Sequence, residues 1–272
     1  MTWSPHARSR SLPPEGAVRC FGRPGAPESE RAPMTIRLHV TQPLAAGLEL
    51  ALPEDAARHA QVRRVQPGDA LRLFDGAGGE WQASVTAMGR REVRVRLGDP
   101  LPALPELAIR VTLAVGVPAN ERMDTLVEKA AELGVAAIQP LLCARSVVRL
   151  TGERAQRREA HWQGVAIAAC EQCGRATVPR IAPLRSLADW LQDPGDAAAR
   201  WLLSPAPGAA AVAATGPTPA SLIALSGPEG GLSPQEVQAA QAAGFRPVSL
   251  GPRILRADTA PLALLAWLGL RG

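Results

Sequence analysis

Glycine and proline crowd one short stretch of the chain, SGPEGGLSPQEV, which covers residues 226–237. Gly227, Pro228, Gly230 and Gly231 leave its backbone with almost no side-chain cover. Glycine adopts positive φ readily and lets a ligand approach the main chain closely. The stretch therefore predicts a loop whose backbone N–H and C=O groups bind a ligand. A tight strand-to-helix turn without a ligand is the alternative.

The residues on either side of this loop indicate where it lies. SLIAL (221–225) is short, apolar and bounded by breakers, which is typical of a strand buried on both faces. Ser233, Pro234 and Glu236 have the spacing of a helix N-cap, a first-turn proline and a capping box. A loop at the carboxyl end of a buried strand is where open α/β sheets bind ligands.

A second loop of similar design lies near the C-terminus. PVSLGPRILRADTA (247–260) runs from an apolar strand through Gly251 into an apolar-basic segment, and a helix is expected to begin near Asp258 or Thr259. The sequence contains neither a P-loop motif, G-x-x-x-x-G-K-[ST], nor the G-x-G-x-x-G fingerprint of a Rossmann fold after a strand. The two loops predict one site made mostly from backbone groups, which suits an adenosine-like ligand.

Length and composition limit the class of protein. With 272 residues, of which 46% are apolar, the chain has room for two domains with a packed core. The sequence contains no run of about 18 apolar residues and no signal-peptide pattern. We therefore expect a cytoplasmic protein without a membrane span.

Arginine is clustered along the chain, although the net charge is only +5. Guanidinium groups bind phosphates in bidentate geometry, so these clusters are compatible both with a nucleic-acid partner and with a solvated charged face. The clusters are Arg58/Arg63/Arg64, Arg90/Arg91/Arg94/Arg96, Arg145/Arg149 and Arg154/Arg157/Arg158.

The cysteines do not form a recognisable metal or disulfide framework. The chain has four of them, unevenly spaced, which argues against a disulfide scaffold at this length. Cys170 and Cys173 form a C-x-x-C, but no second pair follows to complete a zinc site. We expect buried thiols at the end of a helix and no metal.

Changes of pattern divide the chain into three parts. Residues 1–33 are rich in Pro, Gly, Arg and Ser, which predicts a disordered tail or a segment upstream of a true start at Met34. Residues 34–100 have the pattern of a small, mostly β domain with a hairpin turn at 76–79. Residues 101–272 alternate strands and helices after a proline-rich linker, which predicts an α/β domain with a parallel sheet.

Four motifs, in this order, resemble one enzyme family: NERMDTLVEKAAELGV, IAACEQCGR, SGPEGGLSPQEV and LGPRILRADTA. They are similar to motifs of the 16S ribosomal RNA methyltransferases that methylate N3 of a uridine (the RsmE type), and the match runs from about Met34 to the C-terminus. The resemblance implies an α/β fold: a SPOUT-type parallel sheet with a trefoil knot at about 221–262, after a PUA-like β-barrel that holds RNA. Such knots are rare exceptions among protein folds.

The resemblance also implies the cofactor and the partners. The cofactor would be S-adenosylmethionine, and the substrate would be 16S rRNA within the small ribosomal subunit. The enzyme would be a homodimer that uses no metal. The alternatives are a 2′-O-ribose RNA methyltransferase of the same superfamily and a non-catalytic RNA-binding or ribosome-assembly protein.

The motifs assign residues to the cofactor site and to RNA. The resemblance implies that cofactor-binding residues come from three segments at strand ends: Leu203, Ser204, Leu225, Gly227, Pro228, Glu229, Gly230, Gly231, Leu250, Gly251, Ile254 and Leu255. The RNA-binding candidates are His59, Arg63, Arg64, Arg145, Gln172 and Arg175. Of these, Gln172 has the ordering of its own loop as an alternative.

Methyl transfer to uridine N3 requires stabilisation of the uridinate charge and a route for the N3 proton. Arg256 and Arg175 are the catalytic candidates for the first task, because arginine stays protonated in proteins and cannot act as a base. Binding of an rRNA phosphate is the alternative for Arg175. Asp258 is the nearest candidate base, with a helix N-cap as its alternative. The family commonly has Thr-Glu where this chain has Ala257-Asp258, which puts the contacts near the uridine in doubt.

Overall fold

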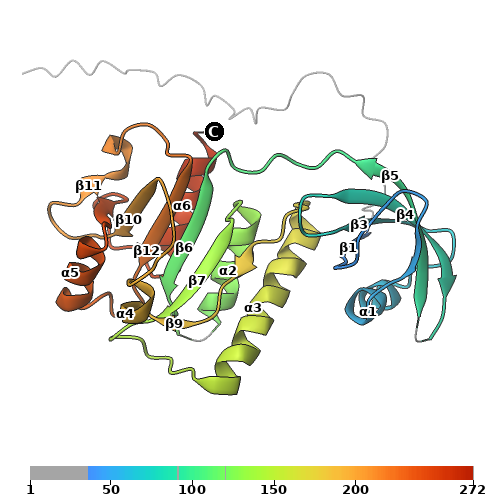
Figure 1. The fold of residues 1–272 in the computed structure, drawn as a ribbon, viewed down its shortest axis with the longest axis horizontal. Helices are drawn as coiled ribbons and strands as arrows, with labels where there is room; N and C mark the ends of the chain where they lie inside the picture. The colour runs from blue at the N-terminus through green and yellow to red at the C-terminus, as the bar shows by residue number, and fades with distance from the viewer. Residues whose placement is uncertain (1–35, 91, 120, 272) are drawn as a thin grey trace, which may run out of the picture. The chain divides into compact units, whose positions relative to one another are not determined.

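A computed structural model describes residues 36–90, 92–119 and 121–271 of the chain. These residues form two β-sheets that follow one another along the sequence (Figure 1). The predicted tail, residues 1–33, lies outside the described residues. No helix in the described part is both long enough and apolar enough to span a membrane.

The first sheet has five strands in the order β1-β3-β4-β5-β2, and all pairs except β1–β3 are antiparallel. Buried side chains such as Leu71, Val85 and Val95 alternate with exposed ones along its strands and form one core with helix α1. The predicted hairpin turn at 76–79 joins β3 to β4. The elements are β1 (Ile36–His39), β2 (Glu49–Ala51), α1 (Glu54–Val62), β3 (Ala70–Phe74), β4 (Glu80–Met88) and β5 (Val93–Leu101).

The second sheet has eight strands and is parallel throughout, with the order β11-β13-β10-β12-β6-β7-β8 and β9 beside β7. Its strands are β6 (Arg110–Gly116), β7 (Ala137–Leu142), β8 (Arg180–Ile181), β9 (Arg185–Ser186), β10 (Ala199–Leu203), β11 (Ala210–Ala211), β12 (Ser221–Ser226) and β13 (Arg246–Ser249). Its helices are α2 (Arg122–Glu132), α3 (Gly152–Cys173), α4 (Leu187–Trp190), the 3-10 helix η1 (Val212–Ala214), α5 (Pro234–Ala242) and α6 (Thr259–Gly269).

Helices cover both faces of this parallel sheet. Side chains of α2, α3 and α6 share a core with Leu222 and Ala224 of β12, whereas α4 and α5 pack against Ile223 and Leu225 of the same strand (Figure 1). Successive residues of a strand point to opposite faces, so β12 is buried on both sides, as predicted. Because the strands are parallel, the loops after β6, β7, β10, β12 and β13 meet at one edge of the sheet.

The fold class predicted from sequence is confirmed: a β-rich N-terminal part precedes a parallel α/β sheet. The sequence did not predict β2, β8, β9, α4, β11 or η1. Each has only two to four residues, which is too short for a periodic pattern to emerge. The knot at about 221–262 stays a prediction.

The β-rich part contacts the parallel-sheet part at the C-terminal end of α3. Phe74, at the end of β3, is buried in one apolar cluster with Ala169, Cys170 and Ala176. The backbone N–H of Gly78, in the hairpin turn, donates to the carbonyl of Ala176 at 3.1 Å. The hairpin of the first sheet therefore packs directly on the segment that follows α3.

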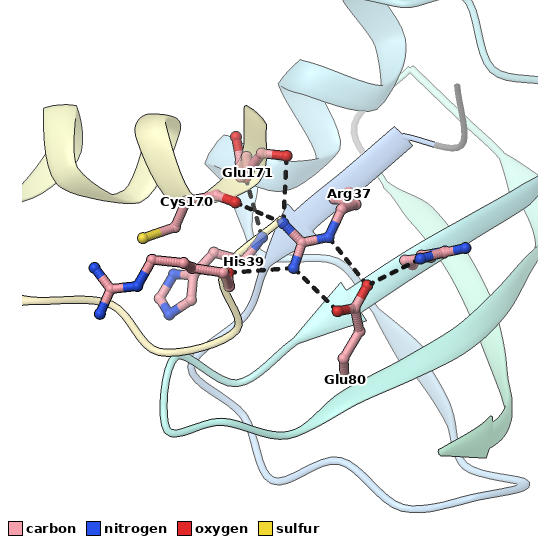
Figure 2. Close-up of polar contacts among 7 residues, drawn as sticks. Arg37, His39, Glu80, Cys170 and Glu171 are labelled. Carbon is pink, nitrogen blue, oxygen red and sulfur yellow. Dashed lines mark hydrogen bonds and ion pairs between the residues drawn. The ribbon is translucent and has the colours of Figure 1, made fainter. Parts of the chain in front are cut away.

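Arg37 of β1 strengthens this contact through a buried ion pair (Figure 2). Its Nε and Nη2 donate to the two carboxylate oxygens of Glu80 at 3.0 and 3.1 Å, and the two side chains are only 9% and 5% exposed. The same guanidinium donates to the carbonyls of Cys170 at 2.5 Å and Arg175 at 3.2 Å. The last four carbonyls of a helix lack partners within the helix. Arg37 Nη1 also donates to one of them, that of Glu171, at 3.4 Å, and the guanidinium charge opposes the negative end of the α3 dipole.

We predict that Arg37→Met lowers the free energy of unfolding by about 3 kcal/mol, because the substitution leaves the buried Glu80 carboxylate with only the more exposed Arg72 guanidinium, at 3.8 Å. Urea unfolding followed by tryptophan fluorescence measures the change. The matched control is Arg58→Met, which removes an exposed ion pair with Glu54 and should cost less than about 1 kcal/mol. Equal losses in the two variants would contradict a structural role for the Arg37–Glu80 pair.

Candidate active site

The glycine-rich loop follows β12 as the sequence predicted. Ser233 caps α5 by accepting a hydrogen bond from the Glu236 N–H at 3.2 Å, and the Glu236 carboxylate accepts from the Ser233 N–H at 2.7 Å. Pro234 occupies the first helical position. The capping box is therefore confirmed, and it fixes the point at which the loop ends.

Close backbone approach holds this loop against the neighbouring strand. A Cβ atom on Gly116, the last residue of β6, would lie 2.5 Å from Pro228 Cδ and 3.0 Å from Cys143 Sγ. A Cβ atom on Gly227 would lie 2.9 Å from the backbone nitrogen of Leu232. The distances of 2.5 Å at Gly116 and 2.9 Å at Gly227 are shorter than a side chain tolerates. Glycine at 116 and 227 is therefore required for the loop to pack here.

Three strand-end segments surround a cavity of about 610 Å³. It lies at the carboxyl ends of β10, β12 and β13, where doubly wound sheets bind ligands. Cavities of a few hundred to a thousand Å³ accommodate small organic ligands. The lining residues are Leu202, Leu203, Ser204, Pro205, Ala206, Ser226, Gly227, Pro228, Glu229, Gly231, Leu232, Val237, Ser249, Leu250, Gly251, Arg253, Ile254, Leu255, Arg256, Ala257 and Ala260.

Few ionisable groups reach this cavity; among its described lining residues they are Glu229, Arg253 and Arg256. The rest of the lining is apolar, hydroxyl or glycine, so recognition falls mainly to backbone groups. Gly251 has a φ of +120°, which side-chain-bearing residues rarely adopt, and its N–H donates to Ser249 Oγ at 3.2 Å. The second glycine loop thus forms one wall through its backbone.

The structure brings ten of the twelve predicted cofactor-binding residues to this cavity. Leu225 and Gly230 do not line it. Leu225 is fully buried in the core on the α4–α5 side of the sheet, and Gly230 faces the Arg145 side chain. The sequence missed further lining residues because strand and loop residues such as Ser226 and Arg253 carry no pattern that distinguishes them from their neighbours.

Arg256 lines the cavity, as expected for a catalytic candidate, whereas Arg175 does not. The Arg175 side chain is buried, and its guanidinium forms an ion pair with Glu106 across two hydrogen bonds, of 3.2 and 2.5 Å. It also donates to the carbonyls of Ala131 and Val135. The prediction that Arg175 contacts substrate or rRNA phosphate is corrected: its donors are occupied inside the protein.

Asp258 occupies the N-cap position of α6, as the alternative predicted, but without the side-chain hydrogen bond that a cap would make. Asp258 does not line the cavity, and its buried Oδ1 has no hydrogen-bond partner among the described residues. Its role as a base stays a prediction.

The RNA-binding candidates at the end of α1 lie on an exposed surface. Arg63 and Arg64 follow α1, and Gln61 donates to the carbonyls of Gly89 and Arg90 in the β4–β5 turn. The Gln61 contact therefore places the turn that carries Arg90 beside Arg63 and Arg64. This basic surface also exposes the apolar side chain of Val62, which is 73% accessible.

The other RNA-binding candidates are placed differently. The Nδ1 of His59 lies 3.2 Å from a carboxylate oxygen of Glu171. The other oxygen of this carboxylate accepts the backbone N–H of His39 (Figure 2). Gln172 is exposed. Arg145 is exposed too, but it donates to the carbonyl of Gly230 at 3.0 Å.

The C-x-x-C pair lies at the end of α3, and no cluster in the described part of the chain has the ligands to hold a metal ion. The Cys170 thiol donates to the Thr177 carbonyl at 3.6 Å. Interaction with this neighbouring thiol lowers the pKa of Cys173 to about 6, with further contributions from the Arg175 backbone and charge. The same interaction, together with burial, raises the pKa of Cys170. Cys173 is thus the thiolate-forming member of the pair.

Two family models match this chain. An RNA methyltransferase domain matches residues 105–269, and an RNA methyltransferase PUA domain matches residues 52–98. Among curated proteins, the ribosomal RNA small subunit methyltransferase E of Synechocystis is 32% identical over 210 residues, covering 76% of this chain and 67% of that protein. The protein of the same name from Bacillus subtilis is 30% identical, covering 78% and 86%.

Solved structures give the same result. A ribosomal RNA small subunit methyltransferase E from Neisseria gonorrhoeae, bound to S-adenosyl methionine, is 36% identical with a TM-score of 0.80, and the match covers 86% of this chain and 96% of that one. A methyltransferase from Legionella pneumophila with bound SAM is 33% identical with a TM-score of 0.83, covering 88% and 98%. With a fold, a cavity and motifs that agree with these matches, the chain belongs to the ribosomal RNA small subunit methyltransferase E family of RNA methyltransferases.

Proposed function

We propose that this protein transfers a methyl group from S-adenosylmethionine to N3 of a uridine in 16S rRNA of the small ribosomal subunit. The observation that carries the proposal is the cavity at the carboxyl ends of β10, β12 and β13, with Arg256 in its lining. Family membership supports the reaction class, and the relatives' names supply the small-subunit rRNA substrate. Ribosomes assemble in the cytoplasm of bacteria, so we place the protein there.

The residues of the cavity fit S-adenosylmethionine. The cofactor's adenosine needs hydrogen-bonding backbone and a flat apolar slot, which Gly227, Gly251 and the leucines at 203, 250 and 255 provide. Once bound, the cofactor supplies an electrophilic methyl group on a sulfonium centre. The protein's own task is to hold that group in line with the uridine and to exclude other nucleophiles.

Two residues at the start of α6 are proposed to act on the uridine. Uridine N3 becomes nucleophilic as its proton leaves, and the permanent charge of Arg256 would stabilise the uridinate that develops. Asp258 is the proposed proton acceptor, because its Oδ1 has no hydrogen-bond partner among the described residues. Compared with the Thr-Glu of the family, Ala257-Asp258 lacks a hydroxyl and has a shorter carboxylate. The uracil would then have to approach α6 closely to reach Asp258.

The basic surface formed by Arg63, Arg64 and Arg90 is the proposed contact with rRNA phosphates. Arg63 and Arg64 lie at the end of α1, and Gln61 holds the neighbouring turn that carries Arg90. Phosphate contacts of this kind position an RNA without reading its sequence. Gln172, which is exposed at the end of α3, is the proposed contact with RNA closer to the target uracil.

The activity is tested by incubating the purified protein and labelled S-adenosylmethionine with small subunits that lack the modification. Digestion of the rRNA and mass spectrometry identify the product. N3-methyluridine at one site is the expected result. A 2′-O-methylated nucleoside would move the assignment to a ribose methyltransferase, and cofactor binding without any product would contradict the proposed substrate.

We predict that Arg256→Ala lowers kcat roughly 100-fold, the effect of removing one transition-state donor, with cofactor affinity changed less than about threefold. Single-turnover methylation and calorimetric titration of the cofactor separate the two quantities. Arg253→Ala is the control, since Arg253 lines the same cavity but is not proposed to contact the uridine. Parallel losses of rate and affinity in Arg256→Ala would indicate a binding role alone.

We also propose that the protein is a homodimer through α6. This helix, TAPLALLAWLG, contains no charged residue, yet Leu262 and Trp267 on it are only partly buried and Leu270, just beyond it, is 89% exposed. A helix that is apolar all round is normally covered by other protein. A second copy of this chain would cover it.

Leu262→Glu is predicted to convert a dimer into a monomer at micromolar concentration, because the substitution puts a charge into the apolar surface of α6. Light scattering after size-exclusion chromatography gives the mass. Gln238→Glu, on the exposed side of α5, adds the same charge and should leave the dimer intact. A monomeric wild type would contradict the proposed interface.

A further inference from the structure

Side chains from neighbouring strand-end loops hold the glycine-rich loop in place from outside the cavity. Glu229 accepts hydrogen bonds from the Ala119 N–H at 2.9 Å and from Arg122 Nη1 at 3.1 Å, which ties the loop to the segment after β6. Arg145, in the segment after β7, donates from Nη1 to the carbonyl of Gly230 at 3.0 Å. The wall of the cavity therefore depends on residues far from it in sequence.

Arg145 also packs its side chain against the loop. A Cβ atom on Gly230 would lie 3.0 Å from Arg145 Cβ and 3.5 Å from Arg145 Cδ, so the arginine stem packs along the glycine backbone. Glu229 and Gly231 line the cavity, but Gly230 between them does not. Arg145 thus holds the outer side of the peptide whose neighbours form the inner wall.

The Arg145 guanidinium has donors to spare. Its side chain is exposed, and within the described residues its one hydrogen bond is to Gly230 O, with no acidic partner. Arginine carries several N–H groups in a planar fork, which suits a phosphate at the same time as a carbonyl. Arg149, also exposed, adds positive charge to the same segment.

We propose that Arg145 is a positioning residue that couples the two substrates: it fixes the cavity wall through Gly230 O and binds an rRNA phosphate with its remaining N–H groups. This rests on the proposed function, because the phosphate is that of the rRNA substrate. A bound phosphate restricts the Arg145 side chain to the rotamer in which it donates to Gly230 O. RNA then strengthens cofactor binding, and the cofactor strengthens RNA binding by the same factor.

The first arm of the test measures, in the absence of RNA, how much Arg145 contributes to cofactor affinity by holding the cavity wall. Calorimetric titration with S-adenosylhomocysteine, which cannot transfer a methyl group, should show about tenfold weaker binding for Arg145→Ala, as expected for the loss of one hydrogen bond from a charged donor. Arg145→Lys retains a donor and should recover most of the affinity. Arg149→Ala removes the same charge from the same segment and should leave the affinity unchanged. Unchanged binding by Arg145→Ala, in a variant that melts like the wild type, overturns the positioning role.

The second arm repeats the titration, with labelled S-adenosylhomocysteine, at saturating small subunits that lack the modification. The wild type should bind about fivefold more tightly than without subunits, a size typical of coupled sites. Arg145→Ala should show no such gain, and Arg145→Lys should lose most of it, because one ammonium cannot replace the planar fork. A gain retained by Arg145→Ala, or absent from a wild type that binds the subunits, overturns the coupling. A wild type that does not bind the subunits at all instead contradicts the proposed function, while the first arm still decides the positioning role.

Discussion

Bare backbone packed against bare backbone, at one edge of a parallel sheet, is the constraint on which the cavity depends. Gly116 ends β6 so close to Pro228 that no side chain fits between them. This contact lets the loop after β12 fold back toward β10 and β13 and close a cavity lined largely by main chain. A site of this kind binds by shape and by peptide hydrogen bonds, so its specificity resides in φ/ψ geometry more than in side-chain chemistry.

Polar contacts between distant loops supply the rigidity that glycine lacks. Glu229 links the glycine-rich loop to the segment after β6, whereas Glu236 and Arg145 link the helix α5 and the loop to the segment after β7. These contacts lie at the rim, where water screens charge, so each contributes less than a buried ion pair would. Together they restrict a backbone that would otherwise be costly to order, since glycine loses the most conformational entropy on folding.

The C-terminal end of α3 has a structural role that its sequence motif alone does not reveal. Arg37, held by Glu80, donates to carbonyls at this end of the helix, and Arg175 is held by Glu106. The residues of EQCGR therefore connect the β-rich part to the parallel-sheet part, and His59 reaches the same point through Glu171. The β-rich part is thus joined by side-chain contacts to α3, the helix that packs beside α2.

The sequence by itself determined the elements whose signals are local: the doubly buried β12, the capping box of α5, the hairpin at 76–79 and the glycines that a bare loop requires. The resemblance of its motifs to a known family also placed about half of the cavity lining, in segments that follow strand ends. Only the tertiary structure decided which partner each charged side chain takes. Arg175 pairs with a residue 69 positions away, Arg145 with one 85 away and Glu229 with one 110 away. A side chain's role as a catalytic, RNA-binding or structural group depends on those partners, and they become neighbours only when the sheet assembles.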